Sequence, residues 1–221
     1  MEKYIVKVLS TEFVTHNVKR FTVEKPSNYT YIPGQATDVA INRPEFINEL
    51  RPFTFTSPVD ADYLEFTIKI YKGHNGITEQ LEQIKPSDEL IIHEPFGAIA
   101  YKGPGVFIAG GAGITPFIAI FRQLQTKGEL TGNTLLFANR TEADIILKDE
   151  LKALLGENYI DVIRNAPSGI SKKLIDKELL AACITHDTAY YYICGPDQFT
   201  LDMIAILKEL GVTDDQIVIE Q

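Results

Sequence analysis

The chain has 221 residues, of which 45% are hydrophobic and 23% are charged, a composition typical of globular proteins with room for one large or two small cores. The net charge is −9 and both halves are acidic, so nucleic acid is not expected as a partner. No apolar run approaches the length of a membrane span, and two cysteines are too few for a four-thiolate zinc or iron–sulfur site.

Residues 1–100 are predicted to form an antiparallel β-barrel. Residues 18–24 and 63–71 alternate apolar with polar side chains, and residues 89–93 form a short apolar run. Clusters of Pro, Gly, Ser and Asn separate these segments, and many short strands at this spacing favour a closed or nearly closed barrel. Charges interrupt the N-terminus every few residues, so no signal peptide is expected, and the low cysteine content predicts a cytoplasmic location.

One predicted strand of this half carries side chains suited to a phosphate-bearing ligand. In the segment RPFTFTS, Arg51 can clamp a diphosphate with two hydrogen bonds, and Phe53 can lie against a flat heteroaromatic ring. Thr54 can donate a hydrogen bond to a ring nitrogen. About twenty residues later, residues 76–78 begin an expected helix, whose first N–H groups suit the same diphosphate. A surface arginine and a core phenylalanine on an ordinary strand are the competing interpretation.

After residue 100 the pattern changes to strands that alternate with helices. Expected strands at 106–109, 134–138, 160–163, 189–194 and 216–220 alternate with expected helices at 115–127, 143–155, 171–182 and 197–210, the last ended by Gly211. This order predicts a doubly wound parallel sheet with its ligand site at the carboxyl ends of the strands. The expected fold class is therefore two-domain, β followed by α/β: a barrel in residues 1–100 and a doubly wound parallel sheet in residues 101–221.

The segment GVFIAGGAGITPF predicts a strand, a glycine turn and the start of a helix. Gly110, Gly111 and Gly113 form the turn, Thr115 is expected as the N-cap, and Pro116 as the first helical residue. Unpaired N–H groups and the positive end of the helix dipole then surround one small space, which suits a phosphate or pyrophosphate. The spacing departs from G-x-G-x-x-G, and a turn whose glycines serve only tightness is the alternative.

A second turn, Cys194-Gly195-Pro196, follows a predicted strand at the same edge of the parallel sheet. Gly195 lets a ligand approach the backbone, and Pro196 suits the first turn of a helix. The Cys194 side chain is small and polarizable, so it can touch a nicotinamide ring without blocking it. A buried cysteine that acts as a small hydrophobe is the alternative.

Taken in order, these motifs resemble those of the ferredoxin–NADP reductase superfamily of two-domain flavoproteins. The resemblance is carried by YIPGQ, RPFTFTS, GITEQL, EPFG, IAGGAGITP and CGP, and it covers nearly the whole chain. The segment LLFANRTEADIILKDEL is most similar to the branch that contains nitrate reductase flavin domains and microsomal cytochrome reductases.

This resemblance implies a role for each motif. Arg51 would hold the flavin phosphates, Phe53 would pack on the isoalloxazine, and Thr54 would hydrogen-bond flavin N5. Cys194 would lie beside the nicotinamide where the hydride is transferred, so Thr54 and Cys194 are the expected catalytic residues. The expected cofactors are FAD and either NADPH or NADH. The full set of expected cofactor-binding residues is Arg51, Pro52, Phe53, Thr54, Ile68, Lys69, Gly76, Ile77, Thr78, Gly110, Gly111, Gly113, Thr115, Arg140, Arg164, Cys194, Gly195 and Pro196; no metal site is expected.

Two arginines bear on the choice of nucleotide. Arg140 and Arg164 follow the second and third expected strands of the parallel sheet, where the adenosine half should lie. Cations there favour the ribose 2′-phosphate, so we expect a preference for NADPH. Against this, Asp161 is close by, NADH-using relatives also carry the run Asn-Arg-Thr-Glu, and arginines at strand ends are common on protein surfaces.

The expected function is that of an FAD-dependent NAD(P)H oxidoreductase, which passes a hydride to FAD and then electrons to a separate acceptor. Phe53 stands where relatives carry tyrosine, and the final residues, Glu220 and Gln221, stand where many relatives carry an aromatic residue over the flavin. No ferredoxin-like or haem module is visible, so the acceptor is a separate protein, such as flavodoxin or ferredoxin, or a small molecule. The alternatives are a reductase component of an oxygenase or haem system, and a non-catalytic flavin-binding electron-transfer subunit.

Overall fold

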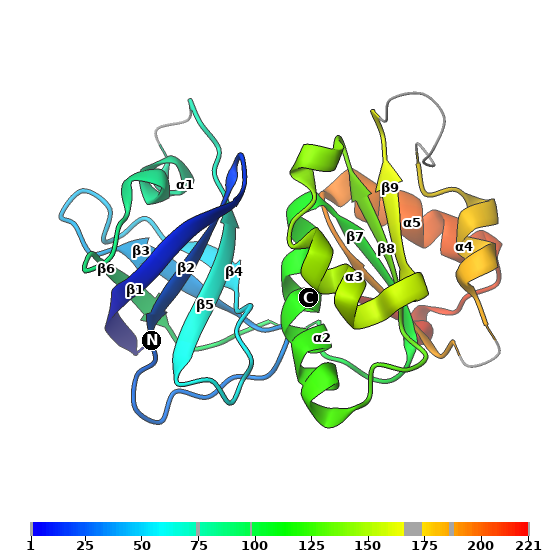
Figure 1. Ribbon diagram of the computed structural model, residues 1–221, viewed down its shortest axis with the longest axis horizontal. Coiled ribbons are helices and arrows are strands. Elements are labelled where there is room, and N and C mark those ends of the chain that lie inside the picture. The colour runs from blue at the N-terminus through cyan, green and yellow to red at the C-terminus, as the bar shows by residue number, and fades with distance from the viewer. Residues whose placement is uncertain (1, 74–75, 98, 166–173, 186–187, 221) are drawn as a thin grey trace.

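The computed structural model describes residues 2–73, 76–97, 99–165, 174–185 and 188–220. Figure 1 shows two halves side by side, a mainly β half that contains the N-terminus and an α/β half that contains the C-terminus. The last strand of the first half ends at His93 and the first strand of the second begins at Gly105. The boundary expected at residue 100 therefore lies in the connection between them.

The first half is an antiparallel, nearly closed barrel, as predicted. Its strands run in the order β4-β3-β6-β1-β2-β5, and an isolated bridge between Phe55 and Phe66 links the two edges of the sheet. A helix of four residues, α1, is followed by a 3₁₀ turn, Leu81–Gln83. The bounds are β1 Lys3–Thr15, β2 Val18–Glu24, β3 Ala36–Ile41, β4 Arg51–Thr54, β5 Tyr63–Lys69, α1 Ile77–Gln80 and β6 Glu89–His93.

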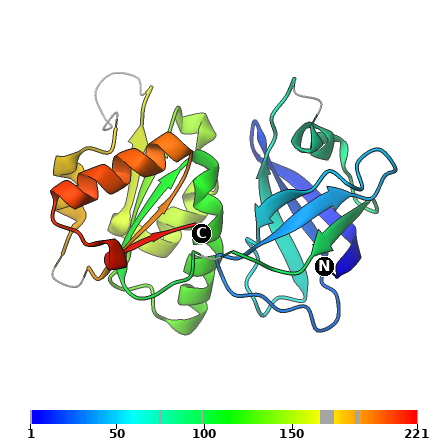
Figure 2. The ribbon, with the colours of Figure 1, turned by 180° about the vertical axis from the view of Figure 1, so that it is seen from behind.

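The second half is a parallel sheet with helices on both faces, which confirms the doubly wound prediction. Its strands run in the order β11-β10-β7-β8-β9 and every neighbouring pair is parallel. One apolar core lies under α2 and α3 and the other under α4 and α5 (Figure 2). The bounds are β7 Gly105–Gly110, α2 Thr115–Lys127, β8 Thr134–Asn139, α3 Lys148–Leu155, β9 Tyr159–Ile163, α4 Lys177–Cys183, β10 Tyr190–Cys194, α5 Asp197–Glu209 and β11 Ile217–Ile219.

Two expected helices begin later than predicted. The helix expected from residue 143 begins at Lys148, because Leu147 has a left-handed backbone (φ 51°) and interrupts the helix after a separate 3₁₀ turn, Glu142–Asp144. The helix expected from residue 171 begins at Lys177. The Asp176 carboxylate caps it by accepting a 2.8 Å hydrogen bond from Leu179 N–H. Residues 171–173 of that prediction lie outside the described residues.

Helix α2 has the expected range, 115–127, but its N-cap lies one residue earlier than predicted. The glycine turn forms a 3₁₀ helix, Gly111–Ile114, which leaves Ile114 at the N-cap and makes Thr115 the first helical residue. The Thr115 hydroxyl donates to the Ala112 carbonyl (3.1 Å) instead of capping the helix. The 3₁₀ turn therefore tightens the path from β7 into α2.

The two halves meet beside α2 (Figures 1 and 2). Val18, from the start of β2, and Ile99, from the connection, are buried in the core that lies under α2 and α3. Gly34 has a left-handed backbone (φ 94°), and a Cβ there would lie 2.2 Å from the Ile99 carbonyl oxygen. In the described ranges, no helix is both long and apolar enough to cross a membrane.

Candidate functional site

The carboxyl ends of β7 and β10 mark the point where the strand order of the parallel sheet reverses. From β7 the chain proceeds through β8 to β9 on one side, and from β10 to β11 on the other. Ligands of doubly wound sheets bind in the crevice at such a point. The two turns that resembled cofactor motifs, residues 110–115 and 194–196, follow these two strands.

Three glycines allow these turns to touch each other. A Cβ at Gly113 would lie 2.2 Å from the Cys194 carbonyl oxygen, and a Cβ at Gly195 would lie 2.6 Å from the Phe199 ring. A Cβ at Gly110 would lie 3.0 Å from the same ring. Phe199 in α5 is thus a site residue that sequence reasoning missed, because only the tertiary fold places it between two turns that are distant in the sequence.

Gly111 differs from its neighbours because it faces open space. Its backbone is left-handed (φ 55°), and a Cβ there would meet no atom within 4 Å. The N–H groups at the start of a helix have no acceptor within the helix, and here they follow directly on that space. The turn therefore combines close packing, at Gly110 and Gly113, with an open position suited to an anionic ligand.

Cys194 is partly buried at this edge and stays protonated. Burial raises the pKa of its thiol to about 12, and the charge of Glu220 adds to the shift. Ile193 pairs with Ile219 across β10 and β11, so Glu220 follows directly beside Cys194. A neutral thiol is not a nucleophile at ordinary pH, and this favours a contact role over covalent chemistry. The register of the last strand is the only signal that could have identified Glu220.

In the barrel, the bridge between Phe55 and Phe66 brings β4 and β5 together. Phe53 is half-buried against the barrel core, and Thr54 pairs with Ala36 of β3. The Ile68 side chain is 1% exposed and belongs to the core, so only its backbone can meet a ligand. Lys69 and Pro52 lie nearer the surface, and the Lys69 ammonium lies 5.7 Å from the centre of the Tyr71 ring.

The Arg51 guanidinium keeps most of its donors available. It is exposed, its hydrogen bond goes to the neighbouring Leu50 carbonyl (2.7 Å), and no carboxylate in the described parts of the chain pairs with it. At the N-terminus of α1, a Cβ on Gly76 would meet no atom within 4 Å, while the buried Ile77 anchors the helix and Thr78 is partly exposed. The guanidinium donors of Arg51 and the N–H groups at the start of α1 suit a diphosphate group.

Arg140 and Arg164 lie beside each other at the ends of β8 and β9. Arg164 N–H donates to the Asn139 carbonyl (2.9 Å) and Asn165 N–H donates to the Arg140 carbonyl (2.8 Å). Both side chains are exposed, and neither pairs with a described carboxylate. Asp161 instead accepts from the Tyr159 hydroxyl and lies 3.2 Å from the Lys148 ammonium. The acidic residue that weighed against a 2′-phosphate site is therefore already paired.

The other candidate ligands are dispersed. His16 contacts the Ala143 carbonyl (3.3 Å) and lies 3.7 Å from the Asp144 carboxylate, and His93 contacts the Asp38 carbonyl (3.1 Å). His74 and His186 lie outside the described residues. No group of three or more metal-ligating side chains occurs within the described ranges.

Figure 1 shows α1 and the carboxyl ends of β8 and β9 on the same, upper side of the molecule.

A polar groove of about 590 Å³ also lies between the halves. Its walls include Arg20, Glu65, Arg122 and Glu150, which are paired with one another or with neighbouring side chains. These charges are already compensated, so the groove is a poorer candidate for an ionic ligand than Arg51, α1 and the two glycine turns.

Comparison with known families agrees with this division of the chain. Residues 5–101 match the family model of the oxidoreductase FAD-binding domain, and residues 107–204 match that of the oxidoreductase NAD-binding domain. The chain therefore has an FAD-binding domain followed by an NAD-binding domain.

Several curated relatives are similar in sequence. Human NADH-cytochrome b5 reductase 1 is 31% identical over 185 residues, which cover 69% of this chain and 61% of that protein. NADH-cytochrome b5 reductase 1 of Aspergillus terreus is 30% identical over 90% of this chain and 75% of its own length. The rat NADH-cytochrome b5 reductase 2 is 28% identical over 97% of this chain and 93% of its own length. The chain thus spans less than two thirds of the human reductase and more of the other two.

Solved structures share the fold. A ferredoxin NADP+ reductase from Neisseria gonorrhoeae, with bound FAD and NADP, has a TM-score of 0.85 and 21% identity, covering 99% of this chain and 98% of its own. The cytochrome b5 reductase domain of Ulva prolifera nitrate reductase has a TM-score of 0.82 and 21% identity, covering 99% of this chain and 97% of its own.

Proposed function

The chain belongs to the ferredoxin–NADP reductase superfamily of two-domain flavoprotein oxidoreductases, and from this premise we propose that it is an FAD-dependent NAD(P)H reductase that delivers electrons to a separate acceptor. The observation that carries the proposal is the meeting of the two glycine turns at the switch point, where Gly113 of one turn packs against the Cys194 backbone of the other and Gly111 faces open space. When bound, NAD(P)H supplies a hydride and FAD stores the electron pair.

We propose that the chain's own residues bind and align the two cofactors. Arg51 and the first N–H groups of α1 hold the diphosphate of FAD, and Phe53 and Thr54 orient its ring. The turn from Gly111 to Thr115 holds the nucleotide phosphates. Cys194 sets how closely the nicotinamide approaches. Holding the two rings in this orientation contributes a large part of the rate of hydride transfer between them, and the transfer needs no acid or base from the protein.

We propose FAD in preference to FMN, because Arg51 and α1 offer two separate sets of donors to one diphosphate. Release of the cofactor by heat, followed by its identification by mass, tests this assignment. FMN, or a protein that binds neither flavin, contradicts it.

For the acceptor, we propose a separate redox protein. Flavodoxin and ferredoxin are the candidates that the motif resemblance favours. The names of the sequence relatives support a second candidate, a haem protein of the cytochrome b5 kind. Steady-state reduction of flavodoxin, ferredoxin and cytochrome b5, each with NADH and with NADPH, separates the candidates by kcat/KM. The cytoplasmic location remains a prediction from the low cysteine content.

A non-catalytic flavin subunit is the competing function. It predicts a protein that is yellow when purified and stays yellow when NAD(P)H is added without oxygen. A reductase is bleached by at least one of the two nucleotides.

A further inference from the structure

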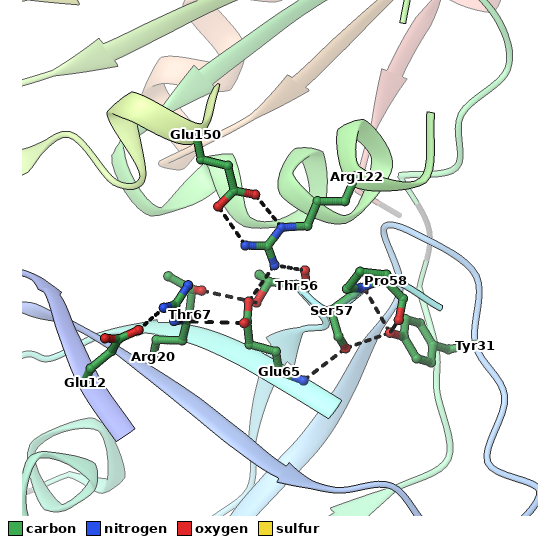
Figure 3. A network of polar contacts seen from close by, with 10 residues as sticks. All are labelled: Glu12, Arg20, Tyr31, Thr56, Ser57, Pro58, Glu65, Thr67, Arg122 and Glu150. Atoms are coloured by element: carbon green, nitrogen blue, oxygen red, sulfur yellow. Dashed lines mark hydrogen bonds and ion pairs between the residues drawn. The ribbon is translucent and has the colours of Figure 1, made fainter. Parts of the chain in front are cut away.

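Arg122 is a buried cation that the cofactor sites do not use. It lies in the middle of α2, and its side chain is only 12% exposed. Its Nε and Nη2 donate to the two oxygens of the Glu150 carboxylate, at 2.6 and 2.9 Å. Its Nη1 donates to Glu65 Oε1 (2.7 Å) and to the Thr56 carbonyl (2.5 Å) (Figure 3). Burial alone would lower the pKa of the guanidinium, but Glu150 and Glu65 raise it above its ordinary value.

These contacts cross from one domain to the other. Arg122 and Glu150 belong to α2 and α3, whereas Glu65 lies in β5 of the barrel and Thr56 follows β4. The acceptors on the barrel side are themselves fixed. Glu65 Oε1 also accepts from the Thr56 hydroxyl (2.7 Å), and Glu65 N–H donates to the Ser57 hydroxyl (3.0 Å). The contacts of Arg122 with Glu150, Glu65 and Thr56, here called the Arg122 clamp, therefore end in the barrel on groups that are themselves held by hydrogen bonds.

At each end, the Arg122 clamp is a few residues away along the chain from one of the two proposed cofactor sites. Thr56 is two residues after Thr54, and Phe55 between them is fully buried and stacked on Tyr31 (ring centres 4.2 Å apart). On the other side, Arg122 is seven residues after Thr115, two turns along the same face of α2. The strand expected to orient the flavin and the helix that begins at the nucleotide turn are thus joined through one guanidinium.

Apart from the exposed His16, which contacts the Ala143 carbonyl and the Asp144 carboxylate, the other contacts described across the seam are apolar and lack this directionality. Val18 and Ile99 are buried apolar side chains in the core under α2 and α3, and Val14 packs against them. Apolar burial holds two surfaces together but is non-directional. A guanidinium fork bound to two carboxylates and a carbonyl fixes both distance and angle. Buried ion pairs also contribute little net stability, and fixing one arrangement is among their best-supported uses.

We propose that Arg122 is a positioning residue. It fixes the angle between the two domains, so that the flavin and nicotinamide rings lie in the relative position that hydride transfer needs. This inference rests on the proposed function, because it concerns the alignment of those two rings. Arg122 touches neither ring and acts through Thr56 on one side and α2 on the other.

The test compares Arg122→Lys with Arg43→Lys in the FAD-loaded protein. Lysine keeps the charge at position 122 but cannot form the fork. Arg43 pairs with Asp88 within the barrel (3.4 Å) and is the matched control. The measurements are the rate of flavin reduction at saturating NADPH and NADH, the long-wavelength charge-transfer absorbance, the FAD content, and the Kd for the oxidised nucleotide.

We expect Arg122→Lys to slow flavin reduction by roughly 10- to 100-fold and to weaken the charge-transfer absorbance, since a small misplacement of reacting groups has costs of this size. FAD content and nucleotide Kd should stay within about twofold of wild type, by the same argument that only alignment has changed. Arg43→Lys should match wild type. A wild-type reduction rate per bound flavin in Arg122→Lys, or a loss of rate only in proportion to lost FAD, overturns the proposal.

Glu65→Gln provides the second variant, which removes the barrel-side charge while keeping the shape of the side chain. It should slow reduction in the same way, and the double variant should be less impaired than the product of the two single effects. If neither variant folds, Arg122 serves stability and the proposal is wrong. If wild-type protein with bound FAD is reduced by neither nucleotide, the proposed function itself fails, and that result is distinct because it appears before any substitution is made.

Discussion

At the scale of a single residue, Cys194 shows how the fold sets the chemistry of a side chain. Burial and the neighbouring Glu220 charge raise the pKa of its thiol to about 12, so the group is neutral near neutral pH. Its place beside Gly113 and Gly195, at the end of β10, is the basis for the role that we propose for it, contact with the nicotinamide ring.

The Cys194→Ala variant should keep its FAD and its fold but reduce the flavin more slowly. Loss of ring positioning costs a few kcal/mol, so we expect a drop of roughly 10- to 1000-fold in the single-turnover rate. Rapid mixing with NADPH in the absence of oxygen measures this rate. Unchanged kinetics in the variant would return Cys194 to the role of a small core hydrophobe.

Arg164 carries the prediction on nucleotide choice. Its exposed side chain and that of Arg140 lie at adjacent strand ends, and Asp161 is held by Lys148 and Tyr159. A charge-assisted contact to a 2′-phosphate is worth roughly 1.5–3 kcal/mol. Arg164→Asp should therefore raise the KM for NADPH at least roughly tenfold and leave NADH little affected.

Lys152→Asp, an equal charge change at an exposed position of α3, is the control for Arg164→Asp. It should leave the ratio of the two kcat/KM values unchanged. A wild-type protein that already prefers NADH, or an Arg164→Asp variant that treats both nucleotides alike, would show that the arginines are ordinary surface residues.

At the scale of an element, two glycines that flank α2 allow the effect of backbone strain to be separated from the effect on nucleotide binding. Gly111 and Gly128 both have left-handed backbones, at φ 55° and 71°, and a Cβ at either would meet no atom within 4 Å. They differ only in place, because Gly111 lies in the proposed nucleotide turn and Gly128 caps the far end of α2.

Gly111→Ala and Gly128→Ala should therefore lose similar stability, about 1–2 kcal/mol each, from backbone strain alone. Only Gly111→Ala should weaken nucleotide binding, by roughly tenfold or more, because its methyl group enters the space that the phosphates need. Urea unfolding and nucleotide titration measure the two effects. Equal nucleotide affinity in both variants would place the nucleotide away from this turn.

The elements that the sequence predicts well are those with a local cause. Residues 105–127 show their strand, glycine turn and helix in one continuous pattern, and α2 has the predicted bounds. Strand β1 was not anticipated, because register shifts near Val8 and near Phe13 break its alternation of inward and outward side chains. The late start of α3 depends on the left-handed Leu147, which no local pattern indicates.

For the candidate site, the motifs identified the two glycine turns and the β4 segment, whose residues are contiguous in the sequence. Phe199, Glu220 and Arg122 were missed because their importance arises from contacts with residues far away in the chain. The packing of Phe199 against two turns exists only after the α/β domain has folded, and the hydrogen bond from Arg122 to Thr56 only after both domains have formed.

At the scale of the whole molecule, buried tyrosines link stability to pH. Burial raises the pKa of Tyr29, Tyr31 and Tyr192 to about 12, from an ordinary value of 10.0. In the unfolded chain these hydroxyls ionise at the lower value, so unfolding releases protons once the pH exceeds about 10. Their contribution to stability is complete below that pH and is lost as the pH rises toward the folded-state pKa.

The free energy of unfolding should therefore fall steeply above about pH 10, by up to about 1.4 kcal/mol per buried tyrosine and pH unit. Tyr31→Phe should reduce this slope, at the cost of the hydrogen bond between Tyr31 and Ser57. Urea unfolding at several alkaline pH values measures both slopes. If the two slopes are identical, the Tyr31 hydroxyl ionises at its ordinary pKa in the folded protein.

The two domains form one reducing unit only if both cofactors bind and their rings meet at the seam. The most direct measurement is anaerobic rapid mixing of the FAD-loaded protein with NADPH, and separately with NADH, while the visible absorbance of the flavin is followed. We expect the flavin to be bleached by both nucleotides within the time of one turnover, and faster by NADPH. A protein that binds FAD but stays yellow with both nucleotides would contradict the central claim that this chain is an NAD(P)H reductase.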